Sequence, residues 1–167
     1  MLMLASKEMI KKLFYLSFAA ALIMTTGCVQ LNPPEINHTG TDFSFLSLQE
    51  VLAKSHFSIK NNNPVGLHGA IEYELWINEN QFSSGISSTV EVDANAQTSF
   101  TINSRIDIVK VFGTLLDLTR AVAAGKASVP FQLKGKFKSD VLGIPVEAPI
   151  SASGQIPLPK LPSNLIN

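Results

Sequence analysis

The sequence predicts a mostly β fold, a two-sheet antiparallel sandwich with one helix. Short runs of alternating apolar and polar residues recur along the chain, and clusters of Asn, Gly and Pro separate them. One segment has apolar residues three and four apart instead, which is the spacing of a helix. With 46% hydrophobic and only 16% charged residues, the chain has enough apolar side chains to fold around a core.

The first expected strands lie in residues 42–60. Residues 42–51 alternate imperfectly, which predicts a bulge or a change of face near Leu46. Residues 55–60 alternate cleanly between apolar and polar side chains. This second strand stops at an Asn-Asn-Asn-Pro turn, residues 61–64.

Residues 69–77 have the clearest strand pattern. Their apolar face holds Ile71, Tyr73, Leu75 and Ile77. Their polar face holds Glu72, Glu74 and Trp76. A hairpin turn at 78–80 leads to short Ser- and Thr-rich strands at 81–85 and 86–92. Residues 97–106 then predict one more strand before the helix.

Residues 107–124 predict a single helix. Its apolar stripe holds Ile108, Val111, Phe112, Leu115, Leu118 and Val122. Asp107 suits the N-terminal end and Gly125 the C-terminal end. Gly113 costs up to about 1 kcal/mol relative to Ala inside a helix, which indicates close packing there. The stripe should cover an open end or face of the sheets. Binding to a bilayer surface is the alternative, but the polar side is not Lys-rich.

Strand patterns return after the helix. The inward side chains of residues 129–138 are expected to be Val129, Phe131, Leu133 and Phe137. The outward ones include Lys134, Lys136 and Lys138, on a solvated face or an edge. Prolines in residues 141–155 predict a final hairpin-like region at an edge or with bulges. Residues 163–167 are expected to be a short tail.

The first 27 residues have the pattern of a secretory signal. A basic head precedes an apolar run, residues 13–24, and small residues then lead to Cys28, the only cysteine. A membrane-spanning helix is the weaker interpretation, because it needs roughly 20 apolar residues. Cleavage and release is another alternative, but it would leave Cys28 as an unpaired thiol in an oxidising compartment.

Thr25-Thr26-Gly27-Cys28 resembles the lipobox of bacterial lipoproteins, although Leu is usual where Thr25 stands. The resemblance implies that Cys28 is acylated, becomes the first mature residue and anchors the chain through membrane lipid. Residues 28–41 would be an extended tether. Val29 is not Asp, which implies the outer membrane, with the domain facing the periplasm. In an organism with one membrane, the domain would lie on the extracytoplasmic face.

Charge argues against a nucleic-acid partner. The first 27 residues hold three basic residues and one acidic residue, so the chain's 13 basic and 13 acidic residues leave 10 and 12 in the rest. This slightly acidic part has no basic surplus for nucleic acid. It also has none to attract the domain to anionic lipid.

No residue pattern predicts catalysis, a metal or a cofactor. His38, His56 and His68 are the only histidines, and none has metal-ligand spacing to Asp, Glu or Cys. Glu72 and Glu74 share a strand face, but a solvated pair balanced by lysines is commoner than a catalytic pair. We therefore expect neither an enzyme nor a small-molecule substrate.

Trp76 is the one candidate contact with a partner. It stands on the polar face of its expected strand, and aromatic residues are favoured at interfaces. The alternative is that its ring packs under the helix or under a loop.

Several motifs together resemble one family. Residues 57–64, Phe-Ser-Ile-Lys-Asn-Asn-Asn-Pro, are similar to the strand and Asn-Pro turn of the WHy (water stress and hypersensitive response) domain of the late embryogenesis abundant type 2 family. Residues 71–77 resemble its next strand, and Gly85 follows as it commonly does there. Residues 131–135, Phe-Gln-Leu-Lys-Gly, and 154–159, Gly-Gln-Ile-Pro-Leu-Pro, resemble two later motifs.

This resemblance covers residues 42–162, including the helix that bacterial members carry. It implies an immunoglobulin- or fibronectin III-like sandwich and a role in tolerance of desiccation, freezing or other stress. We therefore expect a membrane-anchored, non-enzymatic module that shields partly unfolded client proteins. The alternative is a structural or adaptor lipoprotein of the cell envelope, which docks one specific partner through its sandwich.

Overall fold

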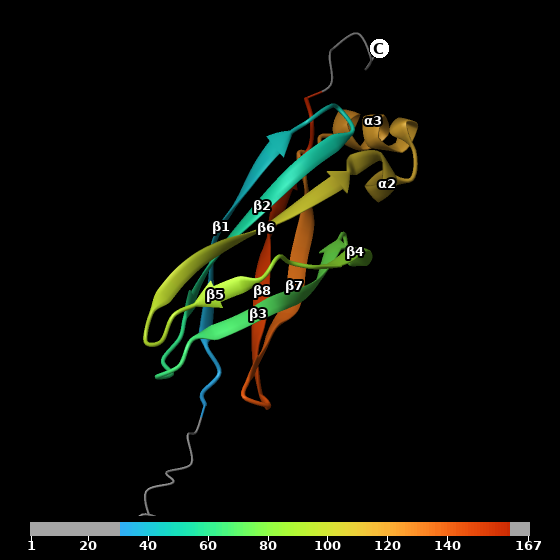
Figure 1. Ribbon diagram of the computed structural model, residues 1–167. Helices are drawn as coiled ribbons and strands as arrows, with labels where there is room; N and C mark the ends of the chain where they lie inside the picture. The colour runs from blue at the N-terminus through green and yellow to red at the C-terminus, as the bar shows by residue number, and fades with distance from the viewer. Residues whose placement is uncertain (1–30, 161–167) are drawn as a thin grey trace, which may run out of the picture. The chain divides into compact units, whose positions relative to one another are not determined.

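The computed structural model describes residues 31–160, and within them eight strands form two antiparallel sheets (Figure 1). The predicted signal, Cys28 and the tail at 163–167 lie outside the described residues. The two sheets confirm the predicted mostly β fold.

Three strands form the smaller sheet, in the order β1-β2-β6. Their bounds are Glu35–Phe45 for β1, Glu50–Lys60 for β2 and Gln97–Asp107 for β6. The larger sheet has the order β4-β3-β7-β8, with β5 also paired to β3. Its bounds are Leu67–Ile77 for β3, Asn80–Ile86 for β4, Val90–Val92 for β5, Ser128–Val141 for β7 and Ile144–Pro157 for β8.

The sheets enclose the core that the alternating patterns predict. The side chains that point into it include Phe57, Ile59, Ile102 and Ile106 from the smaller sheet and Ile71, Leu75, Leu133 and Phe137 from the larger one, all nearly inaccessible to solvent. The rings of Phe43 and Phe131 join the two sheets edge to face, with centroids 5.6 Å apart. Ile108 and Leu118, from the segment after β6, are also fully buried.

The first strand differs from the expectation in both position and length. β1 begins at Glu35, inside the segment expected to be a tether, because residues from Glu35 onward pair with β2. Its N-terminal half is polar, so hydrophobic alternation could not reveal it. The bulge lies between His38 and Gly40 and not near Leu46. At Leu46 the chain instead turns into β2, and the Leu46 N–H donates to the Glu50 carbonyl at 2.9 Å.

The predicted single helix is two short helices, α2 (Ile108–Phe112) and α3 (Leu115–Ala123). Gly113 ends α2 with a φ of 86°, a left-handed conformation that glycine adopts without strain. The expected close packing at Gly113 is wrong, since a Cβ there would meet nothing within 4 Å. Thr114 then caps α3, its hydroxyl accepting a hydrogen bond from the Asp117 N–H. Asp107 caps α2 as predicted.

Two buried asparagines fasten one end of the sandwich. The Asn61 side chain is fully buried, donates to the carbonyls of Val65 at 2.8 Å and Asp93 at 3.0 Å, and accepts from the backbone N–H and side-chain amide of Asn63. The Asn63 side chain in turn exchanges two hydrogen bonds with the backbone of Asn32, at 2.7 and 2.9 Å. We call this set the asparagine network. It joins the end of β2, the β5–β6 turn and the first described residues.

Replacing Asn61 should therefore destabilise the protein strongly. Asn61→Ala leaves the Asn63 N–H, which is buried, and the carbonyls of Val65 and Asp93, which are partly buried, without this partner. An unsatisfied buried group costs about 1–3 kcal/mol, so we expect a loss of at least about 2 kcal/mol. Asn62→Ala is the matched control, because the Asn62 side chain makes an exposed bond to Glu35 and should change stability little. Urea unfolding followed by Trp76 fluorescence measures both. Equal stabilities for the two variants would contradict the role given to the network.

Candidate partner-binding surface

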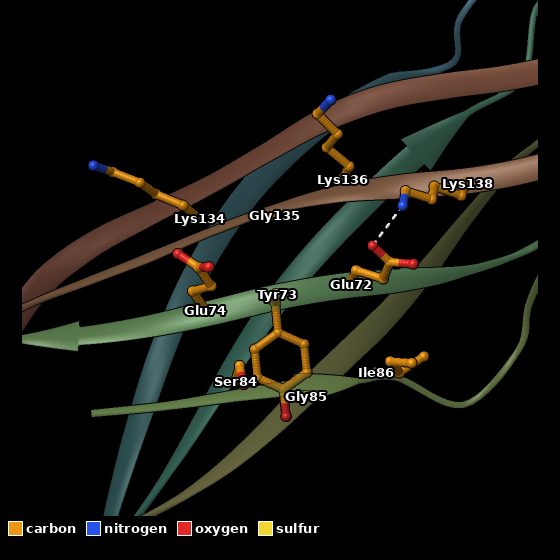
Figure 2. Close-up of a pocket in the computed structure, with 10 residues that line it drawn as sticks. All are labelled: Glu72, Tyr73, Glu74, Ser84, Gly85, Ile86, Lys134, Gly135, Lys136 and Lys138. Carbon is orange, nitrogen blue, oxygen red and sulfur yellow. Dashed lines mark hydrogen bonds and ion pairs between the residues drawn. The ribbon is translucent and has the colours of Figure 1, made fainter. Parts of the chain in front are cut away.

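The outer face of β3 and β7 carries alternating charges and the only tryptophan. We call this the charged face, and its residues are Glu72, Glu74, Trp76, Lys134, Lys136 and Lys138. Strand alternation directs these side chains to one side, while the intervening residues include the core side chains of the same strands. The strand register places Glu72 opposite Lys136 and Glu74 opposite Lys134. Figure 2 shows both strands contributing to the surface.

Ion pairs on the charged face run between strands. Lys138 Nζ donates to Glu72 Oε2, and Lys136 Nζ lies 3.5 Å from Glu147 Oε2 on β8. The hydrogen bond to Glu72, helped by the negative charges of Glu72 and Glu147, raises the pKa of Lys138 above its ordinary value. The expectation that lysines balance the two glutamates is confirmed for Glu72. Such exposed pairs contribute little to stability individually.

The lysine-bearing strand is not at a sheet edge. β7 lies between β3 and β8, so its lysines occupy the solvated face of a central strand. β8, which carries Pro145, Pro149 and Pro157, is at the edge, as its prolines predicted. Sequence reasoning missed Glu147 as a member of this surface. The two-residue turn at Leu142 and Gly143, both with positive φ, fixes the hairpin register that places it opposite Lys138.

Trp76 lies half-buried on the charged face. Its Nε1–H donates to Glu74 Oε2 at 3.2 Å, and Lys134 Nζ lies 5.8 Å from the ring centroid, within cation–π range. Trp76, Gln132 and Glu79 line a shallow hollow there. A contact between Trp76 and a partner stays a prediction.

A second hollow lies on the same sheet. Two of its lining residues are glycines, and the absence of a side chain at each lets parts of β3 come very close. The Tyr73 ring extends across β4 beside Gly85, where a Cβ would lie 2.8 Å from the tyrosine oxygen (Figure 2). A Cβ on Gly135 would lie 2.3 Å from the Glu72 carbonyl oxygen. Any side chain at Gly135 would therefore force β3 and β7 apart. The hollow is shallow, and its lining includes the two glutamates and three lysines of the charged face. Such a hollow suits contact with a macromolecule better than enclosure of a small ligand.

Each of the three histidines has its own polar neighbours. His38 bonds to Thr41 at 2.9 Å, His56 to Asp42 at 3.0 Å, and His68 Nδ1 lies 3.6 Å from Glu91. Among residues 31–160, no group of three or more His, Cys, Asp or Glu side chains could hold a metal ion. Cys28 lies outside the described residues, so its acylation stays a prediction. No helix of the described part is long and apolar enough to cross a membrane.

The ion pair between Glu72 and Lys138 should make the stability of the protein depend on pH. Because the folded state raises the pKa of Lys138, the pair's stabilisation is present below the ordinary lysine value of 10.5 and is lost as pH rises through the raised value. Glu72→Gln should lower the Lys138 pKa toward 10.5, and the stability difference from wild type should vanish in strong alkali. An NMR titration of the lysine ammonium groups measures this. Glu74→Gln is the control, and an equal shift in both variants would contradict the pairing.

Comparison with known proteins places the chain in a family. The sequence profile of the late embryogenesis abundant protein family matches residues 56–154, more than half of the chain. A search of curated proteins found no match.

Solved structures share the fold at low identity. The solution structure of a provisionally assigned late embryogenesis abundant protein has 19% identity and a TM-score of 0.57, covering 93% of this chain and 88% of its own. The solution structure of a protein from Arabidopsis thaliana has 18% identity and a TM-score of 0.56, and the match covers 80% of this chain and 87% of that protein. The crystal structure of a protein from Archaeoglobus fulgidus has 11% identity and a TM-score of 0.51, and the match covers 79% of this chain and 100% of that protein. By its sequence match and its two-sheet fold, this chain belongs to the late embryogenesis abundant protein family.

Proposed function

We propose that this protein is a membrane-anchored, non-enzymatic stress-protection module that shields partly unfolded client proteins during desiccation or freezing. The observation that carries the proposal is the family match over residues 56–154, because proteins of this family are stress-related and generally not enzymes. The sandwich itself provides a second argument. Its faces carry solvated charge, which keeps it soluble while a client is bound.

The anchor would hold the domain close to the membrane. Cys28 precedes Asn32 by four residues, and the asparagine network fixes Asn32 to the sandwich. A fully extended segment of that length spans at most roughly 14 Å. With lipid on Cys28, the asparagine-network end would therefore stay near the bilayer. We place the protein in the outer membrane, facing the periplasm, where clients at that surface would be within reach.

Lipidation can be tested at the single cysteine. Cys28→Ala should abolish incorporation of a radiolabelled fatty acid and move the protein out of the detergent-soluble membrane fraction. Labelling and cell fractionation of both forms measure this. Membrane association that survives the substitution would contradict an anchor at Cys28.

Client protection can be tested without the lipid. A chain of residues 30–167 contains the compact unit that starts at Asn32, and it should preserve a labile enzyme through drying or freeze–thaw cycles. Recovered activity is compared with that given by an unrelated β-sandwich of equal mass. Recovery equal to that control would contradict a protective role for the domain.

A specific adaptor is the second candidate, and the position of Trp76 favours it. A half-buried tryptophan on an accessible sheet face suits a single docking partner. Capture from membranes with the full-length chain should then recover one dominant, stoichiometric partner, and Trp76→Ala should release it. Recovery of many substoichiometric proteins, unaffected by Trp76→Ala, would instead support client shielding.

A further inference from the structure

Strand β6 has no hydrogen-bonded strand on one of its two sides among residues 31–160, although β5 lies near its start. It is the last strand of the smaller sheet, and all 11 of its residues pair with β2 in one unbroken register. After the β5–β6 turn the chain has changed sheets, and β6 has no strand partner other than β2 among the described residues. Figure 1 shows β6 running from that turn to α2, with β2 on one side of it in the view and β5 on the other.

The hydrogen bonds that flank this ladder identify which backbone groups are unpaired. The Asn61 N–H donates to the Ala96 carbonyl at 2.8 Å, and the Ile108 N–H donates to the Gln49 carbonyl at 2.7 Å. Both bonds continue the register of the β2–β6 ladder. On the β6 side they use Ala96 and Ile108, which are both even-numbered. In an antiparallel pair, hydrogen-bonded residues alternate with residues whose backbone groups point away. The odd-numbered residues therefore point away from β2.

The outward backbone N–H and C=O groups thus form a continuous row. The residues that present them are Ser99, Thr101, Asn103 and Arg105. None of the four has a backbone hydrogen bond on that side to any described residue. We call this row the β6 edge.

The edges of β1, β4 and β8 carry features that hinder strand addition, and the sequence of β6 carries none of them. β1 has a bulge after His38 and lies against β8, whose own edge carries three prolines. β4 has only seven residues and shifts register near Trp76. β6 has no proline, glycine, lysine or bulge, and its charges stand only at Arg105 and Asp107. Since proteins usually block long open edges, an unblocked one points to a binding role.

Two hollows beside the β6 edge leave room for side chains of an added strand. One faces the start of β6, and its lining includes Ser88, Thr89, Thr98, Ser99, Phe100 and Thr101. The other faces the end of β6 and includes Phe82, Arg105 and Lys110. Hydroxyls and aromatic rings accept many side-chain types, so the lining does not demand one sequence.

We propose that the β6 edge binds an extended polypeptide segment of an unfolded client, which adds as a fourth antiparallel strand to the smaller sheet. This inference rests on the proposed client-shielding function and names the surface that performs it. Unfolded segments expose backbone amides in pairs spaced like those of the edge, so recognition falls on the main chain and suits many clients. The charged face lies on the other sheet and stays solvated while the segment is bound.

The test uses the full-length chain and one position. Asn103 is exposed, its side chain makes no hydrogen bond within the described residues, and its N–H points away from β2. Asn103→Pro removes that N–H and leaves the ladder to β2 intact, while Asn103→Ala is the matched control. The probe is a fluorescent peptide of alternating Thr and Val, about eight residues long, read by fluorescence anisotropy.

We expect the peptide to bind wild type and Asn103→Ala alike and Asn103→Pro at least about tenfold more weakly. A second peptide, with alternate amides N-methylated, tests the same point on unchanged protein and should also bind at least about tenfold more weakly. Equal binding by all three proteins, or indifference to N-methylation, overturns the proposal. A concentration-dependent dimer that Asn103→Pro abolishes also overturns it, because a second copy would then occupy the edge.

The drying assay separates this inference from the function on which it depends. If Asn103→Pro loses peptide binding and client protection together, the edge is the client site. If it loses peptide binding but protects fully, the edge inference fails and the protective function remains. If wild type gives no protection, the proposed function fails whatever the peptide does.

Discussion

The rest of the structure depends on two buried side-chain amides. Asn61 and Asn63 have almost no exposed surface, and hydrogen bonds occupy each of their polar side-chain atoms. Burying amides this way costs little only while every bond is made, so the set forms or fails as a unit. It holds the end of β2 against the turn that carries the chain between the sheets. Both the packing of the core and the course of β6 follow from that junction.

The junction explains why the faces and edges of the sandwich differ. The β5–β6 turn transfers the chain to the smaller sheet, where, within residues 31–160, β6 pairs with β2 alone. In the larger sheet, β7 lies between β3 and β8, and its lysines face solvent. Lys138 pairs with Glu72, and Lys136 pairs with Glu147. The charged face and the proposed client-binding edge therefore lie on different sheets. A protein that shields unfolded clients needs both at once, since the bound client adds apolar surface to the complex.

Local patterns could predict the interior of the fold but not its boundaries or its edges. Alternation identified Leu75, Leu133 and Phe137 as core residues because each lies in a strand with one buried face. The polar start of β1 gave no such signal, and Gly113 interrupts a helical pattern through its backbone conformation alone. The charged face was predictable, whereas the β6 edge follows from strand order, which long-range pairing decides. Trp76 was correctly placed outward, and acylation of Cys28 stays a prediction.

The central claim is that the asparagine network holds the end of β2 against the β5–β6 turn and that the outward backbone groups of β6 are unpaired. Residue-resolved amide hydrogen exchange of the full-length protein, without any client, tests this claim. The account predicts that the amides of Asn61 and Asn63 exchange only through global unfolding, because their hydrogen bonds are buried. The outward amides of Thr101 and Asn103 should exchange many times faster than their neighbours Ile102 and Ser104, which bond to β2. Slow exchange at the outward amides, or fast exchange at the asparagines, would contradict it.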